Sequence, residues 1–170
     1  SNTDGQGAVL AILEHMALAG KNAVIIGAGG AARAVGSAII GQGANLYITN
    51  RTEQKGRRLA EELRAEFAAE DRLDQIPADI LINTTPVGMH PGSDAMPVSA
   101  SVLRPELFVM DIVYNPVHTR LLSEALHRGC SVIDGVGMFV YQGARQFMLW
   151  TGCEAPVAQM RRLVYDYLKT

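Results

Sequence analysis

The chain has 170 residues, of which 48% are hydrophobic and 19% are charged, and its formal net charge is −2. This composition is typical of one globular domain or of one half of a larger enzyme. The small net charge and the lack of basic blocks argue against a nucleic-acid or anionic-membrane surface, and no apolar run is long enough to cross a membrane. Cys130 and Cys153 have neither metal nor redox spacing, so we expect two reduced, buried thiols in a cytoplasmic protein.

Short apolar runs alternate with helical patterns along the chain. A helical pattern covers residues 6–19, and Asp4 precedes it in the position of an N-cap. Strands are then predicted at residues 23–26, 46–49, 79–82, 107–112 and 131–133, and helices at residues 31–40, 52–67, 119–128, 138–149 and 157–168. Buried strands separated by helices predict an α/β fold, in which helices cover both faces of a doubly wound parallel sheet.

One strand of such a sheet is weak in this sequence. A doubly wound fold normally has its third strand between Phe67 and Asp79, but the segment AAEDRLDQIPA is short and polar. Either this strand is vestigial, around residues 73–76, or residues are missing from the sequence. The sequence leaves both explanations open.

The segment between the first strand and the second helix is rich in glycine. Its residues match the GxGxxA fingerprint of Rossmann-like dinucleotide-binding folds, and they are Gly27, Ala28, Gly29, Gly30, Ala31 and Ala32. In this motif the first glycine makes a tight turn, the second lets the backbone approach a pyrophosphate, and the small last residue allows close packing. The pyrophosphate then accepts hydrogen bonds from free N–H groups at the helix start. Such a motif also occurs in plain turns, but its position between strand and helix favours a dinucleotide site.

The residues after the second strand indicate which dinucleotide is bound. An NAD site places an acidic side chain about 20 residues after the glycine motif, where it accepts from the ribose 2′-hydroxyl. Here the strand ends in Asn50, Arg51 and Thr52, and Lys55 follows within one helical turn. A guanidinium suits a 2′-phosphate, which favours NADP over NAD. The alternative is that Arg51 and Lys55 are solvated charges, with Glu53 reducing the local positive field.

Three further polar segments follow predicted strands. They are residues 83–89, 113–116 and 134–138. In an open α/β sheet, ligands bind beyond the carboxyl ends of the strands, so these segments are placed for a cofactor cleft. Gly135 and Gly137 would allow the backbone to come close to a nicotinamide. A plain turn is the alternative for each segment, since all three are rich in turn-forming residues.

Six motifs in chain order closely resemble the shikimate dehydrogenase family. They are NTDG, VIIGAGGAARAV, NRT, INTTPVGM, DIVYNP and DGVGMFVYQGARQFMLWTG. The resemblance covers nearly the whole chain, but it extends only to the family's cofactor-binding half, with the end of the linking helix and the closing C-terminal helices. It implies that an N-terminal substrate domain is absent from this sequence.

Members of the family reduce 3-dehydroshikimate to shikimate with NADPH, on the pathway through chorismate to aromatic amino acids. The resemblance implies cofactor contacts along four segments of the chain. These contacts are Gly27, Ala28, Gly29, Gly30 and Ala31 for the pyrophosphate, Asn50, Arg51, Thr52 and Lys55 for the adenosine phosphate, Ile112 and Gly135 beside the nicotinamide, and Thr84 and Met138 elsewhere on the cofactor.

The resemblance also implies a substrate site. Asp4 matches the family's substrate-binding acid, which acts beside a catalytic lysine, and Tyr114 and Gln142 match positions that reach toward the substrate. Reducing a carbonyl needs a proton donor within hydrogen-bond reach, and the family's lysine lies in the substrate domain. Lys21 and Lys55 are not placed to replace it. From the residues alone, Asp4 is a helix N-cap and Gln142 a polar residue on a helix.

We therefore expect the NADP-binding domain of a shikimate dehydrogenase, inactive by itself, with a small-molecule substrate and with neither nucleic-acid nor membrane partners. The alternatives are a quinate/shikimate dehydrogenase that uses NAD, a bifunctional dehydratase–dehydrogenase parent, and a non-catalytic NADP-binding module. The four histidines form no metal spacing and are expected at the surface; they are His15, His90, His118 and His127.

Overall fold

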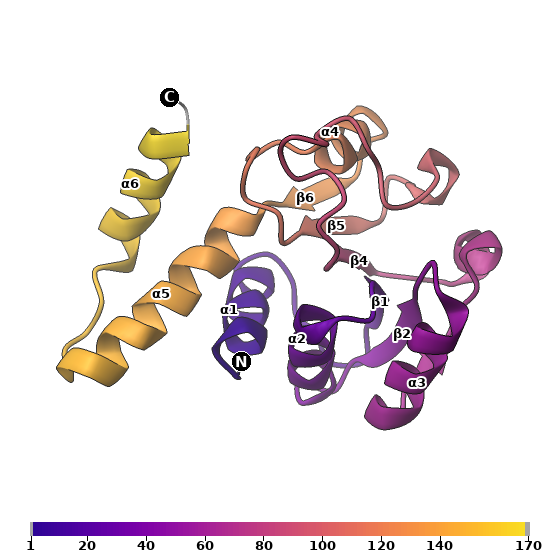
Figure 1. Ribbon diagram of the computed structural model, residues 1–170, viewed down its shortest axis with the longest axis horizontal. Coiled ribbons are helices and arrows are strands. Elements are labelled where there is room, and N and C mark those ends of the chain that lie inside the picture. The colour runs from indigo at the N-terminus through magenta and orange to yellow at the C-terminus, as the bar shows by residue number, and fades with distance from the viewer. Residues whose placement is uncertain (1, 169–170) are drawn as a thin grey trace.

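The computed structural model describes residues 2–168, with only the backbone of Asn2. Its centre is a six-stranded parallel sheet with the strand order β3-β2-β1-β4-β5-β6, which is the order of a Rossmann fold (Figure 1). The strands are β1 (Asn22–Ile26), β2 (Asn45–Thr49), β3 (Glu66–Phe67), β4 (Ile80–Asn83), β5 (Phe108–Asp111) and β6 (Ser131–Ile133). The predicted fold class is confirmed.

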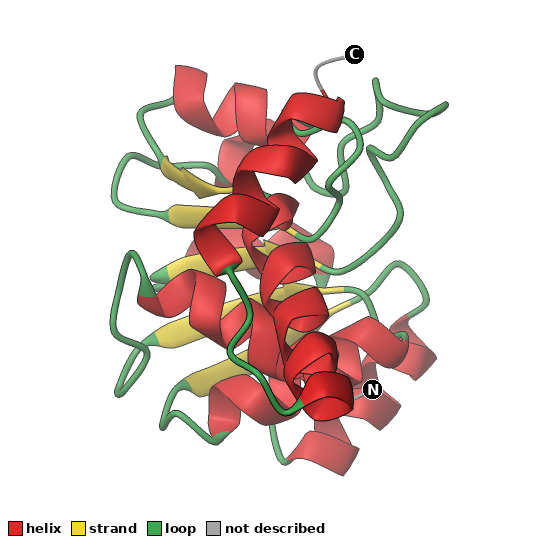
Figure 2. Ribbon diagram, turned by 90° about the vertical axis from the view of Figure 1, so that its left-hand side faces the viewer, coloured by secondary structure: helices red, strands yellow, loops and turns green. Residues whose placement is uncertain are grey.

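Helices lie on both faces of the sheet, and the sheet is seen between them in Figure 2. They are α1 (Asn2–Leu13), α2 (Gly30–Ile40), α3 (Glu53–Leu63), α4 (Arg120–His127), α5 (Gly135–Thr151) and α6 (Val157–Leu168), with the short 3-10 helices η1 (Glu70–Gln75) and η2 (Ala100–Val102). The last helix, α6, stands beside α5 at the edge of the molecule (Figure 1) and has no buried residue. No helix in residues 2–168 is long and apolar enough to cross a membrane.

The alternation of side chains along the strands produces two apolar cores. In β1, Ile25 packs with α1, α2 and α3 on one face, whereas Val24 and Ile26 pack on the other face with α4 and the 3-10 helices. Successive strand side chains point to opposite faces, so strands buried on both faces must be apolar at nearly every position. This is why the predicted strands have nearly continuous apolar sequences.

The first helix differs from its predicted bounds. α1 ends at Leu13 rather than at residue 19, and Asp4 lies in its first turn rather than at the N-cap. Two glycines let α1 pack between α2 and α5: a Cβ at Gly5 would lie 2.2 Å from the carbonyl oxygen of Ala34, and one at Gly7 would lie 2.8 Å from that of Met138. This close packing holds the start of the chain in helical conformation, against the intrinsic propensity of glycine.

The third strand is short, as expected, but it does not lie at residues 73–76. It is the two-residue β3, which pairs with Tyr47 and Ile48 of β2, whereas residues 73–76 lie in and just after η1. The predicted helix over residues 52–67 ends at Leu63, because Arg64 adopts a left-handed conformation with φ 55° and turns the chain back toward the sheet. Phe67 is therefore a strand residue, packed at the edge of the core.

The other elements lie within a few residues of their predicted bounds. α5 begins three residues earlier than expected, because the side chain of Asp134 caps it by accepting from the backbone N–H of Val136 at 3.0 Å. Both cysteines are free thiols, but only Cys130 is buried; the prediction of burial was wrong for Cys153, which is exposed.

Candidate dinucleotide and substrate site

The glycine motif forms the turn between β1 and α2. Gly27 has φ +118°, a conformation that glycine adopts at little cost, and its N–H donates to the carbonyl oxygen of Thr49 at 2.8 Å. A Cβ at Gly27 would lie 2.7 Å from Oγ1 of Thr84. The turn is therefore held between the carboxyl ends of β2 and β4, at the point where the strand order reverses and where ligands bind in such sheets.

The next two glycines face open space. A Cβ at Gly29 or at Gly30 would meet no heavy atom within 4 Å, and both residues are exposed. Gly29 is the N-cap of α2, and no side chain caps the helix, so its first N–H groups remain available. Ala28 and Ala31 are half-buried beside them. The space and the free donors both fit a pyrophosphate.

The carboxyl end of β2 carries the predicted cations. Arg51, Thr52 and Lys55 are exposed, and Asn50 holds the turn into α3 by donating from Nδ2 to the carbonyl oxygen of Thr52 at 2.8 Å. Within the described residues, no ion pair involves Arg51 or Lys55. The nearby Glu53 forms an ion pair with Arg57 at 2.7 Å, so the negative charge of Glu53 is paired with Arg57 rather than with Arg51 or Lys55. Both cations are thus available to an anionic ligand.

The ends of β4 and β5 are joined by a buried carboxylate. Asp111 is 0% exposed and accepts three hydrogen bonds, from Nδ2 of Asn83 at 3.0 Å, from the N–H of Val113 at 3.0 Å and from Oγ1 of Thr119 at 2.8 Å. Burial raises the pKa of Asp111 to about 6, although the hydrogen bonds oppose this rise. No sequence pattern indicated Asp111 as part of the site.

This raised pKa predicts a pH dependence of stability. The folded state binds the Asp111 proton more tightly than the unfolded state does. Protonated Asp111 therefore adds to the free energy of unfolding; this stabilisation is complete below about pH 4 and is lost as the pH rises through about 6. The loss amounts to at most about 3 kcal/mol. We expect Asp111→Asn to gain this much relative to wild type between pH 4 and 7 in urea denaturation. A stability difference that does not change with pH would contradict the assignment.

A cavity of about 450 Å³ opens beside these strand ends. It is lined by Thr84, Thr85, Pro86, Met89, His90, Ile112, Val113, Tyr114 and Asn115. Two predicted cofactor residues, Thr84 and Ile112, thus meet in one cavity. Gly135 lies against the same segment, since a Cβ there would lie 2.6 Å from the carbonyl oxygens of Ile112 and Val113. Met138 is buried one turn further along α5.

The predicted substrate residues come from three distant parts of the chain. Nε2 of Gln142 on α5 donates to Oδ1 of Asp4 on α1. Tyr114 stacks on Phe139 of α5, with ring centroids 4.7 Å apart, and remains exposed. The structure therefore joins Asp4 to Gln142 and places Tyr114 against the same helix.

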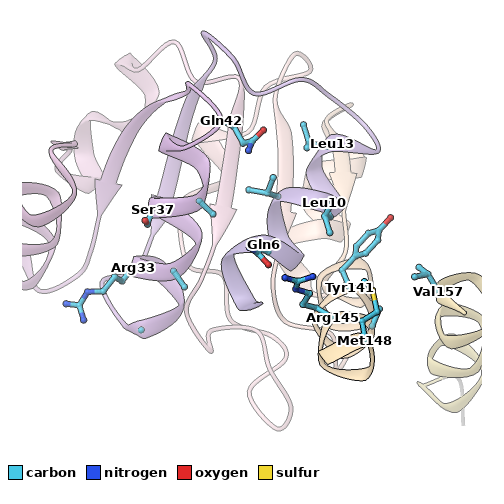
Figure 3. Close-up of a pocket in the computed structure, with 15 residues that line it drawn as sticks. Gln6, Leu10, Leu13, Arg33, Ser37, Gln42, Tyr141, Arg145, Met148 and Val157 are labelled. Carbon is cyan, nitrogen blue, oxygen red and sulfur yellow. The ribbon is translucent and has the colours of Figure 1, made fainter. Parts of the chain in front are cut away.

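A larger groove of about 1190 Å³ follows α1 between α2 and α5 (Figure 3). Arg33 and Gln42 lie toward opposite ends of α2 along it, and Tyr141, Arg145 and Met148 line its α5 side. Most of this groove lies along the helices, away from the strand ends where the motifs gather. It is therefore not the candidate dinucleotide site.

Two contacts that the sequence analysis missed hold α6 against the rest of the molecule. The hydroxyl of Tyr165 donates to Oδ2 of Asp134 at 2.6 Å, and Arg161 donates to both carboxylate oxygens of Glu14. Their partners are far apart in sequence, so no local pattern indicates them. The four histidines are exposed as predicted, and no cluster of metal-binding side chains occurs in residues 2–168.

The chain matches two family models. Residues 9–112 match the model of shikimate / quinate 5-dehydrogenase, and residues 135–165 match that of the shikimate 5'-dehydrogenase C-terminal domain. Among curated proteins, NADP(+) shikimate dehydrogenase of Methanopyrus kandleri is 46% identical, over 99% of this chain and 63% of its own length.

Solved structures of dehydrogenases with these names are also similar to this chain. Shikimate 5-dehydrogenase from Thermus thermophilus, in complex with NADP(H) and shikimate, is 34% identical with a TM-score of 0.89, over 96% of this chain and 62% of that one. Quinate dehydrogenase from Corynebacterium glutamicum, in complex with NAD, is 27% identical with a TM-score of 0.82, over 97% of this chain and 60% of that one. The chain thus spans less than two thirds of the length of these relatives. With one family model covering more than half of its residues and the other its C-terminal helices, the chain belongs to the shikimate dehydrogenase family.

Proposed function

We propose that this chain is the NADP-binding half of a shikimate dehydrogenase, which reduces 3-dehydroshikimate to shikimate with NADPH. The observation that carries the choice of cofactor is the end of β2, where Arg51 and Lys55 are exposed and Glu53 is engaged by Arg57. A planar guanidinium can bind a 2′-phosphate through two parallel hydrogen bonds, whereas the 2′-hydroxyl of NAD calls for an acidic partner.

The residues fit the cofactor along the whole carboxyl edge of the sheet. Gly29 and Gly30 leave room for the pyrophosphate at the start of α2, and the cavity bounded by Thr84 and Ile112 can take the nicotinamide end. The bound cofactor supplies the hydride. The apolar residues of that cavity, which include Ile112 and Val113, would contact the ring, and Gly135 allows α5 to begin directly against the backbone of residues 112–113.

The substrate would bind beside α1 and α5. Asp4 and Gln142, joined by a hydrogen bond, present a carboxylate and an amide, which suit the hydroxyl groups of a small polyol acid. Tyr114 adds an exposed phenol on the same side. The proton donor is proposed to be a lysine of the substrate domain, held beside Asp4.

The end of α5 supports the existence of such a domain. Four consecutive large apolar residues are exposed there, and these are Phe147, Met148, Leu149 and Trp150, with Trp150 81% exposed. Exposed apolar patches of this kind mark interaction surfaces. We propose that the substrate domain covers them in the full-length protein. A cytoplasmic location, favoured by the free thiols, also stays a prediction.

Replacing Arg51 tests the choice of cofactor. We expect Arg51→Ala to weaken NADP binding by about 1–3 kcal/mol, through loss of a charge-assisted contact, and to leave NAD binding almost unchanged. Isothermal titration calorimetry with both dinucleotides measures this difference directly. Arg58→Ala provides the matched control, because Arg58 is an exposed arginine on α3, the helix that follows Arg51.

Equal weakening of both dinucleotides by Arg51→Ala would show that Arg51 does not recognise the phosphate. Tighter binding of NAD than of NADP by the wild-type protein would favour the second candidate, a quinate/shikimate dehydrogenase that uses NAD, which the similarity to the Corynebacterium glutamicum enzyme supports. Binding of NADP by a full-length protein that turns over neither acid would favour a non-catalytic module.

A further inference from the structure

The buried carboxylate of Asp111 accepts hydrogen bonds from residues outside its own strand, β5. Its Oδ1 accepts from Asn83 and from the N–H of Val113, and its Oδ2 accepts from the hydroxyl of Thr119. These three donors belong to the end of β4, the segment after β5 and the N-cap of α4. One side chain therefore connects three separate parts of the carboxyl edge.

Asn83 and Thr119 make further hydrogen bonds to residues near them in the chain. Oδ1 of Asn83 accepts from the N–H of Thr85 at 3.0 Å and from its Oγ1 at 2.7 Å, and Nδ2 of Asn83 also donates to the carbonyl oxygen of Val87 at 3.2 Å. Oγ1 of Thr119 accepts from the N–H of Leu122 at 3.3 Å and so caps α4. The segments that follow β4 and β5 are thus held in register through Asp111.

These two segments are the walls of the 450 Å³ cavity, whereas Asp111 does not line it. Thr85 and Val113 do line it, and both are hydrogen-bonded within this network. The start of α5 depends on the same backbone, because Gly135 packs against the carbonyl oxygens of residues 112 and 113. A shift of the segment after β5 would therefore move one wall of the cavity and the start of α5 together.

Burying a carboxylate is unfavourable for the stability of a fold. Moving a carboxylate out of water is unfavourable unless it is hydrogen-bonded, and burial here raises the pKa of Asp111 to about 6. What the carboxylate adds is geometry, since it accepts from three donors at defined angles. This cost is explained if the position of the cavity walls matters to function.

We propose that Asp111 is a positioning residue, which sets the nicotinamide end of the cofactor site through Asn83, Val113 and Thr119. The inference rests on the proposed function, in which Ile112 and Gly135 lie beside the nicotinamide. It assigns to Asp111 no contact with cofactor or substrate. Its effect must therefore appear in binding of the whole dinucleotide and in turnover, and be absent from binding of the adenosine half.

The test compares NADP with 2′,5′-ADP, which carries only the adenosine and phosphate end, using the full-length enzyme. For Asp111→Ala we expect the affinity for NADP and kcat each to fall at least about tenfold, while the affinity for 2′,5′-ADP stays within about twofold. Calorimetry gives both affinities, and the absorbance of NADPH gives kcat with shikimate.

A gentler pair of variants guards against unfolding, because Asp111→Ala leaves three buried groups without their acceptor. Thr119→Val removes the hydrogen bond to Asp111 and the side-chain cap of α4 at nearly constant volume, and it should lower NADP affinity and kcat by about fivefold. Thr119→Ser keeps the hydroxyl and should restore both. Thermal unfolding of each variant shows that the fold is retained.

Two results would overturn the inference. One is a parallel loss of NADP and 2′,5′-ADP affinity in Thr119→Val, which would indicate a general structural role. The other is unchanged NADP affinity and kcat in the folded Asp111 and Thr119 variants. Failure of the wild-type enzyme to bind NADP at all is a separate outcome, which would overturn the proposed function and this inference with it.

Discussion

The isolated chain is expected to bind NADP but to oxidise no measurable shikimate. Its glycine turn, cations and cavity all lie within the described residues, whereas Asp4, Tyr114 and Gln142 are proposed to form only one side of the substrate site. A substrate that is not enclosed loses the positioning that can lower a reaction barrier by roughly 7–11 kcal/mol. This is the largest effect that the two-domain proposal predicts.

No lysine of the described chain can replace the proposed proton donor. Lys21 precedes β1 at the amino edge of the sheet, opposite the cavity, and its Nζ lies 3.0 Å from Oδ1 of Asp79. Lys55 lies on α3, beside the proposed adenosine phosphate. Lys169 lies outside the described residues.

The measurement follows NADPH absorbance with shikimate and NADP, first for this chain alone and then with the proposed substrate domain supplied as a separate polypeptide. Calorimetry with NADP shows in parallel that the isolated chain is folded and binds. Recovery of turnover on adding the second domain is the expected result. Turnover by the chain alone would contradict the two-domain proposal and require a proton donor among these 170 residues.

Gly29→Val is expected to abolish cofactor binding without unfolding the protein. Gly29 has φ −94°, which a valine can adopt, and a Cβ there meets no protein atom within 4 Å. In the proposed function, the pyrophosphate enters this same space. Losing its hydrogen bonds to the start of α2 should weaken NADP binding at least about 100-fold, or about 2.7 kcal/mol.

Ser37→Val is the matched control, since Ser37 is exposed on the same helix and lies about two turns from the glycine motif. Circular dichroism and thermal unfolding should show both variants folded, and calorimetry should show NADP binding only in the control. Normal NADP binding by a folded Gly29→Val protein would mean that the glycine turn does not hold the pyrophosphate.

The strands, most helices and the dinucleotide motif could be predicted because they depend on neighbouring residues. The β1 sequence is apolar at consecutive positions, and the glycine turn needs Gly27 for its backbone conformation, whatever the rest of the chain does. The cations at the end of β2 belong to the same group, since Arg51 and Lys55 are placed by their distance along the chain from the strand. Local chemistry was enough to suggest NADP.

Elements that depend on distant partners were predicted less well. The helix pattern over residues 52–67 continues past Leu63, but Phe67 gains more by pairing β3 with β2 and packing on the core. α1 begins earlier than its apolar pattern suggests because Gly5 and Gly7 allow contacts with α2 and α5. In both cases tertiary packing outweighed the local preference.

The contacts within the candidate site also depend on distant partners. Asp4 and Gln142 are 138 residues apart, and nothing in the residues near either of them indicates that the two side chains meet. Asn83 and Asp111 are separated by 28 residues and look like ordinary turn formers at two strand ends. Only the parallel register of β4 and β5, which places Asn83 beside Asp111, turns them into one buried network. Hydrogen bonds across a sheet depend on which strands are neighbours, and that choice is made by the tertiary fold.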